Sequence, residues 1–268
     1  MKVSKQQKLN GVFLGVFILS TLVLGACGVS KGTDQIGELE SSDIINGKTM
    51  GKSNENSRSI VAIVADKNEG QSLCTGTIVS PEVILTAAHC VDGAPRSLHI
   101  VFGVNVRKTK EKDIREADKF TQHPSWKRHI QSGEGDLALI HFKGILPEGY
   151  SPLKLASESL SLKIGQKVLM AGFGVTDGEN ESGSGILRQT SSVILEQRNP
   201  TEFVTDGQKS SVCFGDSGGP AFVKVGKVYV QWGVASSVLN KSCDDASIHT
   251  AIMKYDSWIK LTINKMQH

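Results

Sequence analysis

The chain contains no dense run of lysine and arginine, and its 30 basic residues nearly balance its 27 acidic ones. Proteins that hold nucleic acid usually concentrate positive charge on one stretch or face. The sequence also lacks a Cys-x-x-Cys pair and a close group of several cysteines and histidines, the spacing typical of structural zinc sites. We therefore expect no nucleic-acid partner, no bound metal and no cofactor.

Long apolar segments are scarce as well. The first one, residues 12–26, has about fifteen residues and is short for a helix that crosses a bilayer. Three lysines precede it, as in a signal peptide: Lys2, Lys5 and Lys8. The segment ends in Leu-Gly-Ala before Cys27, which resembles a bacterial lipobox. We expect residues 1–26 to be a signal peptide of lipoprotein type and Cys27 to carry lipid. An ordinary secretory signal cut near Ala26 and an uncleaved anchor are the alternatives, and each of them also implies export.

The other cysteines indicate disulfide bonds. Four remain besides Cys27: Cys74, Cys90, Cys213 and Cys243. Export favours disulfides, and four cysteines allow three pairings, which the spacing alone leaves open.

The body of the chain has the pattern of strands and turns. Residues 27–43 are polar and indicate a tether or propeptide. Short apolar runs then alternate with turns that use many of the 28 glycines and seven prolines. The expected strands are 60–64, 74–79, 83–86, 98–106, 167–174 and a pair within 226–236. We expect the charged stretch 108–119 to be a solvated hairpin. The spacing of 255–263 predicts a helix that docks through Trp258, Leu261 and Ile259.

The segment 213–220, Cys-Phe-Gly-Asp-Ser-Gly-Gly-Pro, carries the strongest chemical signal. Clustered glycines mark a tight or strained backbone path. Such a turn can aim backbone N–H groups at an oxyanion, and Ser217 would be a nucleophile if a base lay beside it. A glycine-rich turn with an incidental serine is the alternative.

A histidine and an aspartate could supply that base. His89 ends an apolar strand in Thr-Ala-Ala-His-Cys, where small residues leave room for close packing. Asp136 opens the apolar run Leu-Ala-Leu-Ile, and a carboxylate there is costly unless it is paired. A structural histidine and a turn-capping aspartate are the alternatives to a carboxylate that orients a histidine.

Together these segments resemble the trypsin/chymotrypsin family of serine peptidases. The matching motifs follow the family's order: Ile-Ile-Asn-Gly at 44–47, Thr-Ala-Ala-His-Cys at 86–90, Asp-Leu-Ala-Leu-Ile at 136–140 and Gly-Asp-Ser-Gly-Gly-Pro at 215–220. The resemblance implies an all-β fold of two six-stranded antiparallel β-barrels with a C-terminal α-helix. We expect residues 44–150 to form the N-terminal barrel, and residues 151–268 the C-terminal barrel and the helix.

The resemblance also implies roles for single residues. Ser217 would be the nucleophile, His89 its base, and Asp136 the group that orients the imidazole. The N–H groups of Gly215 and Ser217 would form the oxyanion hole. The implied disulfide pairings are Cys74–Cys90 and Cys213–Cys243.

In this family, cleavage of a precursor frees an α-ammonium group that pairs with the aspartate beside the nucleophile. The resemblance makes Ile44 the new N-terminus and Asp216 its partner. Asp43 stands before the cut, where the family usually has Arg or Lys. We therefore expect a different activating peptidase, self-processing or stepwise trimming. Because residues 28–43 contain no cysteine, cleavage would release the domain from a lipid on Cys27.

Three residues align with the substrate pocket of the family. Ser211 stands where trypsins have Asp, so a preference for Arg or Lys is not expected. Val238 and Ser247 align with wall positions where glycine is common, so the resemblance implies a narrow pocket for small or medium apolar residues. The competing hypothesis is a preference for acidic residues, with His249 near the rear of the pocket. A structural role is the alternative for His249.

The sequence thus predicts an exported serine endopeptidase that acts as a monomer on protein or peptide substrates. Before activation it would be held at the membrane of the bacterial cell envelope through Cys27, and activation would release it. The alternative is a non-catalytic binding module on the same fold. Such relatives generally lose a residue of the triad, and here His89, Asp136 and Ser217 are all present.

Overall fold

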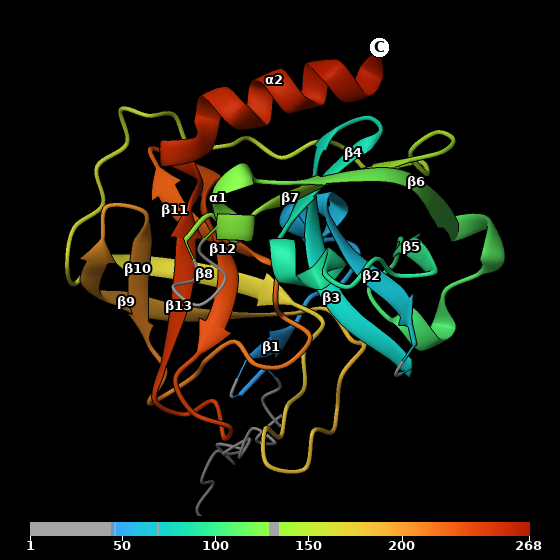
Figure 1. Cartoon of the computed structure of the whole chain (residues 1–268). Coiled ribbons are helices and arrows are strands. Elements are labelled where there is room, and N and C mark those ends of the chain that lie inside the picture. Colours follow the sequence, from blue (N-terminus) through green and yellow to red (C-terminus); the bar gives the residue numbers. More distant parts are fainter. Residues whose placement is uncertain (1–43, 46, 69, 129–133) are drawn as a thin grey trace, which may run out of the picture. The chain divides into compact units, whose positions relative to one another are not determined.

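The computed structural model describes residues 44–268 except 46, 69 and 129–133. The signal peptide, Cys27, the tether and Asp43 therefore lie outside the described residues, as do Asn46 and Glu69. Within the described part, strands dominate and a helix closes the chain (Figure 1). No helix in this part is long and apolar enough to span a membrane.

Six antiparallel strands close into the first barrel, in the order β2-β3-β4-β7-β6-β5. Their bounds are β2 Ile60–Lys67, β3 Gly70–Ser80, β4 Val83–Thr86, β5 Ser97–Val101, β6 Ile114–Gln122 and β7 Ala138–Phe142. The strands form because β-branched and apolar residues fit a pleated surface whose inner side is buried. In β4, Val-Ile-Leu-Thr, every residue is buried.

A second closed barrel follows, in the order β8-β9-β10-β13-β12-β11, with β11 pairing back to β8. The bounds are β8 Lys167–Gly172, β9 Arg188–Asn199, β10 Glu202–Asp206, β11 Pro220–Val225, β12 Val228–Val238 and β13 Ala246–Ala251. The short strand β1, Lys48–Thr49, pairs antiparallel with the start of β9. The expected pair of six-stranded antiparallel barrels is confirmed.

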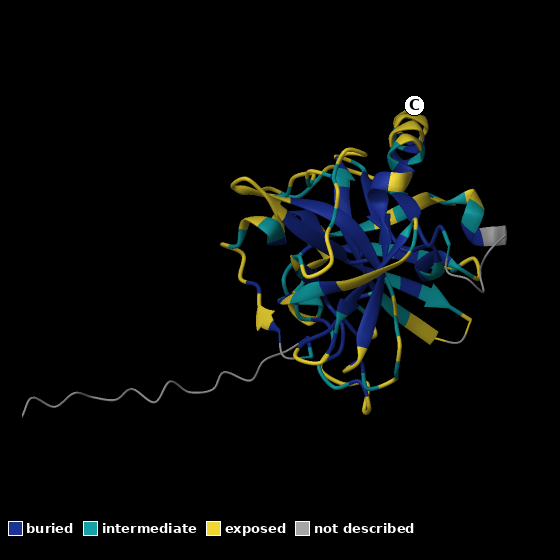
Figure 2. Ribbon diagram, turned by 90° about the vertical axis from the view of Figure 1, so that its left-hand side faces the viewer, coloured by how far each residue is buried: buried dark blue, intermediate teal, exposed yellow. Residues whose placement is uncertain are grey.

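Apolar side chains from both barrels pack together. Ile60 and Ala62 of β2 share one cluster with Ala171 of β8 and Phe222 of β11, and all four are buried. Figure 2 shows the buried residues gathered in the middle of the strands and the exposed ones in the connecting loops. The contact between barrels matters for function because it fixes loops of one barrel against loops of the other.

Several predicted element bounds were wrong. The predicted strand 98–106 ends at Val101, because the chain turns at Gly103, whose φ is +147°, and enters a 3-10 turn at Val106–Lys108. The predicted hairpin 108–119 is two short turns followed by β6. A pair of strands was predicted within 226–236, but β12 alone fills this range, and its hairpin partner is β11, which ends before it. Strands β9, β10 and β13 were not predicted.

The C-terminal helix was predicted correctly, but its docking face was partly wrong. Helix α2, Asp256–Gln267, buries Ile259 and Met266 and leaves Leu261 62% exposed. Positions 259 and 266 are seven residues apart and therefore share a face of a helix with 3.6 residues per turn, whereas 261 points elsewhere. Trp258 is half-buried, as expected.

Candidate active site

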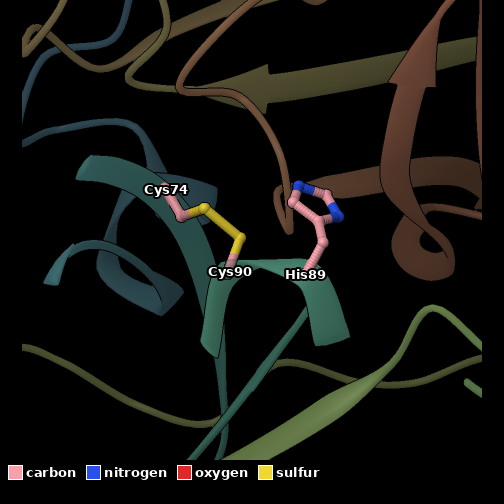
Figure 3. A group of neighbouring side chains, drawn as sticks. All are labelled: Cys74, His89 and Cys90. Carbon is pink, nitrogen blue, oxygen red and sulfur yellow. A yellow bond between two sulfur atoms is a disulfide. The ribbon is translucent and has the colours of Figure 1, made fainter. Parts of the chain in front are cut away.

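His89 lies in a short 3-10 turn, Ala88–Val91, directly after strand β4. Ala87 and Ala88 are fully buried, so the turn lies close against the barrel. The neighbouring Cys90 forms a disulfide with Cys74 of β3, as the resemblance implied. Figure 3 shows the imidazole on the same turn as the disulfide, which ties this turn to the barrel wall.

Asp136 binds the histidine at two points. Its Oδ2 lies 2.8 Å from His89 Nδ1, and its Oδ1 accepts a hydrogen bond of 3.0 Å from the His89 backbone N–H. Ser236 Oγ donates to the same Oδ2 at 2.6 Å. Asp136 is 1% exposed, so these three bonds offset the cost of burying its charge.

This arrangement sets the protonation of the imidazole. Burial alone would lower the pKa of His89, but the hydrogen bond and the charge of Asp136 raise it above its ordinary value. A carboxylate on Nδ1 also fixes the tautomer in which Nε2 is free to accept a proton. His89 is therefore suited to act as a base that becomes a stabilised imidazolium.

Ser217 sits in the loop between Cys213 and β11, and that loop is held by the first barrel. Thr75 of β3 donates from its N–H to the Ser217 carbonyl at 2.8 Å and from its hydroxyl to the Gly215 carbonyl at 2.8 Å. Gly218 follows with φ +83°, and a Cβ there would lie 2.0 Å from Thr86 Oγ1. Only glycine fits at this close approach.

Gly215 has φ +98°, a conformation that favours glycine. Across the part of the chain that the structure describes, the backbone N–H groups of Gly215 and Ser217 donate no hydrogen bond to another protein group. They belong to one tight turn two residues apart. Two unpaired N–H groups beside a serine hydroxyl form the kind of arrangement that stabilises an oxyanion.

A cavity of about 300 Å³ opens between the two barrels, and both His89 and Ser217 line it. Its other walls include the apolar side chains of Val212, Phe214 and Val238. Phe214 is 40% exposed at this site, although its neighbours in sequence are mostly buried. The cavity can therefore accept an apolar group beside the serine and the histidine.

The structure separates the three predicted pocket residues. Val238 lines the cavity, whereas Ser211 and Ser247 are fully buried and lie outside its lining. Ser247 Oγ bonds Thr205 Oγ1 at 2.9 Å, and His249 Nε2 lies 3.0 Å from the same threonine oxygen. Burial lowers the pKa of His249 to about 3, so its imidazole is neutral at physiological pH.

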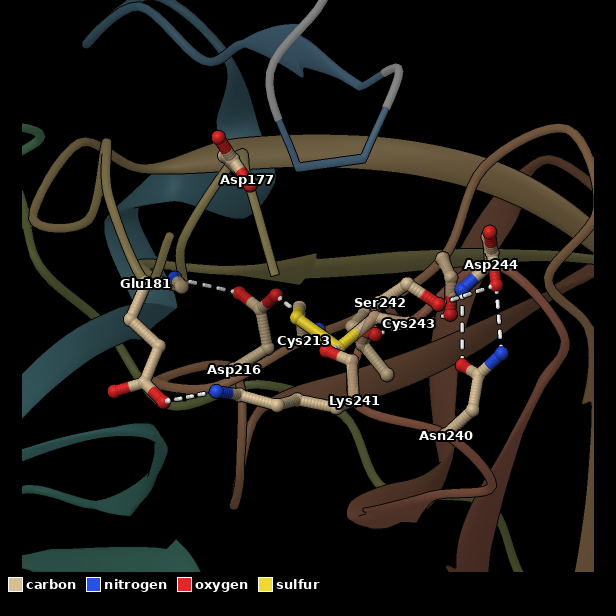
Figure 4. The surroundings of a disulfide bond; sticks show 12 residues. Asp177, Glu181, Cys213, Asp216, Asn240, Lys241, Ser242, Cys243 and Asp244 are labelled. Atoms are coloured by element: carbon tan, nitrogen blue, oxygen red, sulfur yellow. Dashed lines mark hydrogen bonds and ion pairs between the residues drawn. A yellow bond between two sulfur atoms is a disulfide. The ribbon is translucent and has the colours of Figure 1, made fainter. Parts of the chain in front are cut away.

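Asp216, the residue before Ser217, is fully buried (Figure 4). Its oxygens accept hydrogen bonds from the N–H groups of Gly174 at 2.7 Å and Cys213 at 2.8 Å. A Cβ on Gly174 would lie 2.4 Å from Asp216 Oδ2, so the carboxylate fills the space against this glycine. Burial raises the pKa of Asp216 to about 7, although these bonds and the charge of Arg188 oppose that shift.

The segment at Ile44 lies close to the same loop. Ile44 is fully buried with φ +62°, a strained conformation for a β-branched residue. The Ile45 carbonyl accepts a hydrogen bond from Ser211 N–H at 3.2 Å, and the Ile45 side chain packs near the disulfide Cys213–Cys243. The start of the described chain thus lies beside the loop that carries Ser217.

Cys74, His89 and Cys90 form the one group among the described residues whose ligand atoms lie close enough together to hold a metal. The two sulfurs are bonded to each other in the disulfide (Figure 3). They are therefore not available as thiolates, which are the form of cysteine that binds metals.

Sequence reasoning missed the role of Ser236 and the exposed Phe214 at the cavity. Val238 was predicted to form a pocket wall, and its three preceding neighbours Ala235, Ser236 and Ser237 line the cavity with it. The bond from Ser236 to Asp136 joins residues 100 positions apart, and no local pattern marks it.

Comparisons with known proteins agree with this geometry. The family model described as Trypsin matches residues 48–259. Human granzyme M is 29% identical over 72% of this chain and 80% of its own length, and chymotrypsin from Phaedon cochleariae is 26% identical over 75% of each. A dog protein described as hepatocyte growth factor activator serine proteases is 30% identical over 71% of this chain, which spans 33% of that relative. The chain therefore belongs to the trypsin family of serine peptidases.

Proposed function

We propose that this protein is a serine endopeptidase that hydrolyses peptide bonds through an acyl-enzyme. The observation that carries the proposal is the binding of His89 by the buried Asp136 beside a cavity that Ser217 also lines. The family's proteolytic relatives support the same activity. Protein or peptide substrates follow from it.

Ser217 Oγ attacks the carbonyl carbon of the scissile bond, and His89 Nε2 takes the hydroxyl proton. Asp136 stays ionised and stabilises the imidazolium. His89 then gives the proton to the departing amine, which leaves Ser217 acylated. Water attacks the ester next: His89 takes its proton, the acid product leaves, and Ser217 regains its hydroxyl proton from His89.

The negative charge on the carbonyl oxygen in each tetrahedral intermediate would be held by the N–H groups of Gly215 and Ser217. The conformation of Gly215 supports this role, because it leaves both donors unpaired within the described residues. Losing one such donor typically costs about 100- to 1,000-fold in rate.

The substrate pocket favours a small or medium apolar side chain before the scissile bond. The apolar side chains of Val212 and Val238 on its lining support this preference. The competing preference for acidic residues would need a positive charge, and the low pKa of the buried His249 argues against one. Of the three predicted pocket residues, Val238 carries this preference, because Ser211 and Ser247 are buried outside the lining.

Activation would follow cleavage after Asp43. The new α-ammonium group of Ile44 would pair with Asp216, whose buried carboxylate has two backbone donors and a raised pKa in the uncut chain. The strained φ of Ile44 supports the proposal, because cleavage frees this residue from the preceding peptide bond. A buried ion pair there would order the loop that carries Gly215.

We also propose that the precursor is exported as a bacterial lipoprotein and matures as a monomer. The charged start, the short apolar stretch and the small residues before Cys27 support a lipoprotein signal. The two disulfides accord with an oxidising compartment. Cleavage before Ile44 would separate the domain from the lipid. The four cysteines of the domain are paired with one another, so none of them forms a disulfide with Cys27.

Replacing the nucleophile tests the proposed enzyme against a binding module. Ser217→Ala should lower kcat by on the order of a million-fold, because no other group can form the acyl-enzyme. A fluorophosphonate probe should label the processed wild type and leave the variant unlabelled, while the exposed-site control Ser159→Ala should label normally. Absence of labelling in processed wild type would support the binding module.

The uncut chain should become less stable as pH rises from about 4 to 7. Folded Asp216 keeps its proton up to about pH 7, whereas the unfolded carboxyl loses it near 3.8. The folded chain therefore binds more protons in this window, and its free energy of unfolding falls as pH increases. Urea titrations should compare Ser217→Ala, which prevents self-processing, with the double variant carrying Asp216→Asn. If the free energy of unfolding depends on pH equally in the two chains, Asp216 does not have a raised pKa in the folded state.

Processing should coincide with activity and release. The mass and the N-terminal sequence of the exported protein should show a start at Ile44 in the active fraction, and this form should leave the membrane fraction. Full activity with residues 28–43 still attached would reject the Ile44–Asp216 mechanism. As a control, Cys27→Ser lacks the thiol that would carry the lipid and should incorporate no labelled fatty acid.

Widening the cavity should change substrate preference. Val238→Gly removes a side chain from the lining, so kcat/KM for a peptide anilide with Phe before the scissile bond should rise at least tenfold relative to Ala. Val225→Gly, at an exposed strand end, controls for the general effect of glycine. An unchanged Phe-to-Ala ratio in Val238→Gly would reject this pocket assignment.

A further inference from the structure

Two polar side chains bracket the turn that carries His89. Asp92 directly follows the turn, and Gln122 ends strand β6. Gln122 Nε2 donates to the Ala88 carbonyl at 2.9 Å and also to Asp92 Oδ1. One amide thus joins the residue before His89 to the carboxylate that lies three residues after it.

Asp92 also binds the aromatic neighbour of the imidazole. Trp126 Nε1 lies 3.1 and 3.0 Å from the two oxygens of Asp92. The Trp126 side chain is buried, and its ring centroid lies 6.5 Å from that of His89 at an interplanar angle of 52°. Asp92 therefore sets the position of the ring beside the imidazole.

The charged groups around His89 come from three elements. Asp136 binds Nδ1 from the start of β7, Asp92 lies beyond the turn, and Lys67 ends β2. Burial lowers the pKa of His89, Asp136 raises it most, Asp92 raises it further, and Lys67 lowers it. The half-buried Asp92 is thus a second carboxylate that favours the imidazolium.

We propose that Asp92 is a positioning residue for the reaction, holding His89 through Gln122 and Trp126 and supporting its positive charge. The proposal rests on the proposed peptidase function. Gln122 and Trp126 keep the turn and the ring from shifting while Ser217 transfers its proton to His89 Nε2. A small displacement of a catalytic base is costly, because proton transfer needs hydrogen-bond distance to the nucleophile.

The test is the pH profile of kcat/KM for activated enzyme. Asp92→Asn removes the charge, and the NH2 group that replaces one carboxylate oxygen cannot accept a hydrogen bond from the Trp126 indole N–H. We expect a loss of roughly tenfold in kcat from poorer positioning and an acid limb of kcat/KM displaced to lower pH, since His89 loses a charge that favours its protonated form.

Trp126→Phe separates the two effects. It keeps an aromatic ring and the Asp92 charge but removes the indole donor, so kcat should fall while the acid limb stays in place. The matched control is Asp118→Asn, which removes another aspartate bound to a histidine, His141, at 2.6 Å outside the cavity. This control should keep the wild-type profile.

Titration with the fluorophosphonate probe gives the concentration of competent sites, so a folding defect does not count as a loss of kcat. The proposal is wrong if Asp92→Asn has the kcat of the wild type and the same acid limb of kcat/KM. If Asp92→Asn does not fold, an unchanged kcat in Trp126→Phe would also overturn the proposal. Persisting hydrolysis in Ser217→Ala would instead reject the proposed function itself.

Discussion

The buried carboxylate of Asp136 joins the two barrels at the candidate active site. It accepts from the backbone and ring of His89, on a turn of the first barrel, and from Ser236, on strand β12 of the second. A charge that is 1% exposed persists only when such partners surround it. These three hydrogen bonds fix the tautomer of the imidazole and join the turn of His89 to strand β12, beside the apolar cluster that packs the two barrels together.

The local parts of this site could be predicted from the sequence. Clustered glycines identified the turn around Ser217, and the positive φ angles of Gly215 and Gly218 show why those residues are needed. Asp136 was expected to need a partner because it opens a buried strand, and His89 is that partner. The disulfide pairing came from the family resemblance, because the spacing of four cysteines allowed three solutions.

Contacts between distant segments could not be predicted in the same way. No local pattern in the sequence places Trp126, yet Asp92 holds it beside His89. Leu261 was expected to dock, but the phase of helix α2 is set by the surface that it covers, and Ile259 faces that surface. Sequence patterns indicate which residues prefer burial or a turn. Which distant residue each buried side chain contacts is decided by the packing of the whole fold.

Neither barrel contains a complete set of reacting groups. The histidine and the aspartate belong to the first, the serine belongs to the second, and the bond from Ser236 to Asp136 spans 100 positions. Contacts between residues far apart in sequence lose chain entropy when the long loop between them closes. The hairpins within each barrel join neighbouring strands and close shorter loops. The serine and the imidazole therefore stay in separate halves of a newly made chain until the barrels dock. A copy in which only one barrel has folded holds an incomplete site.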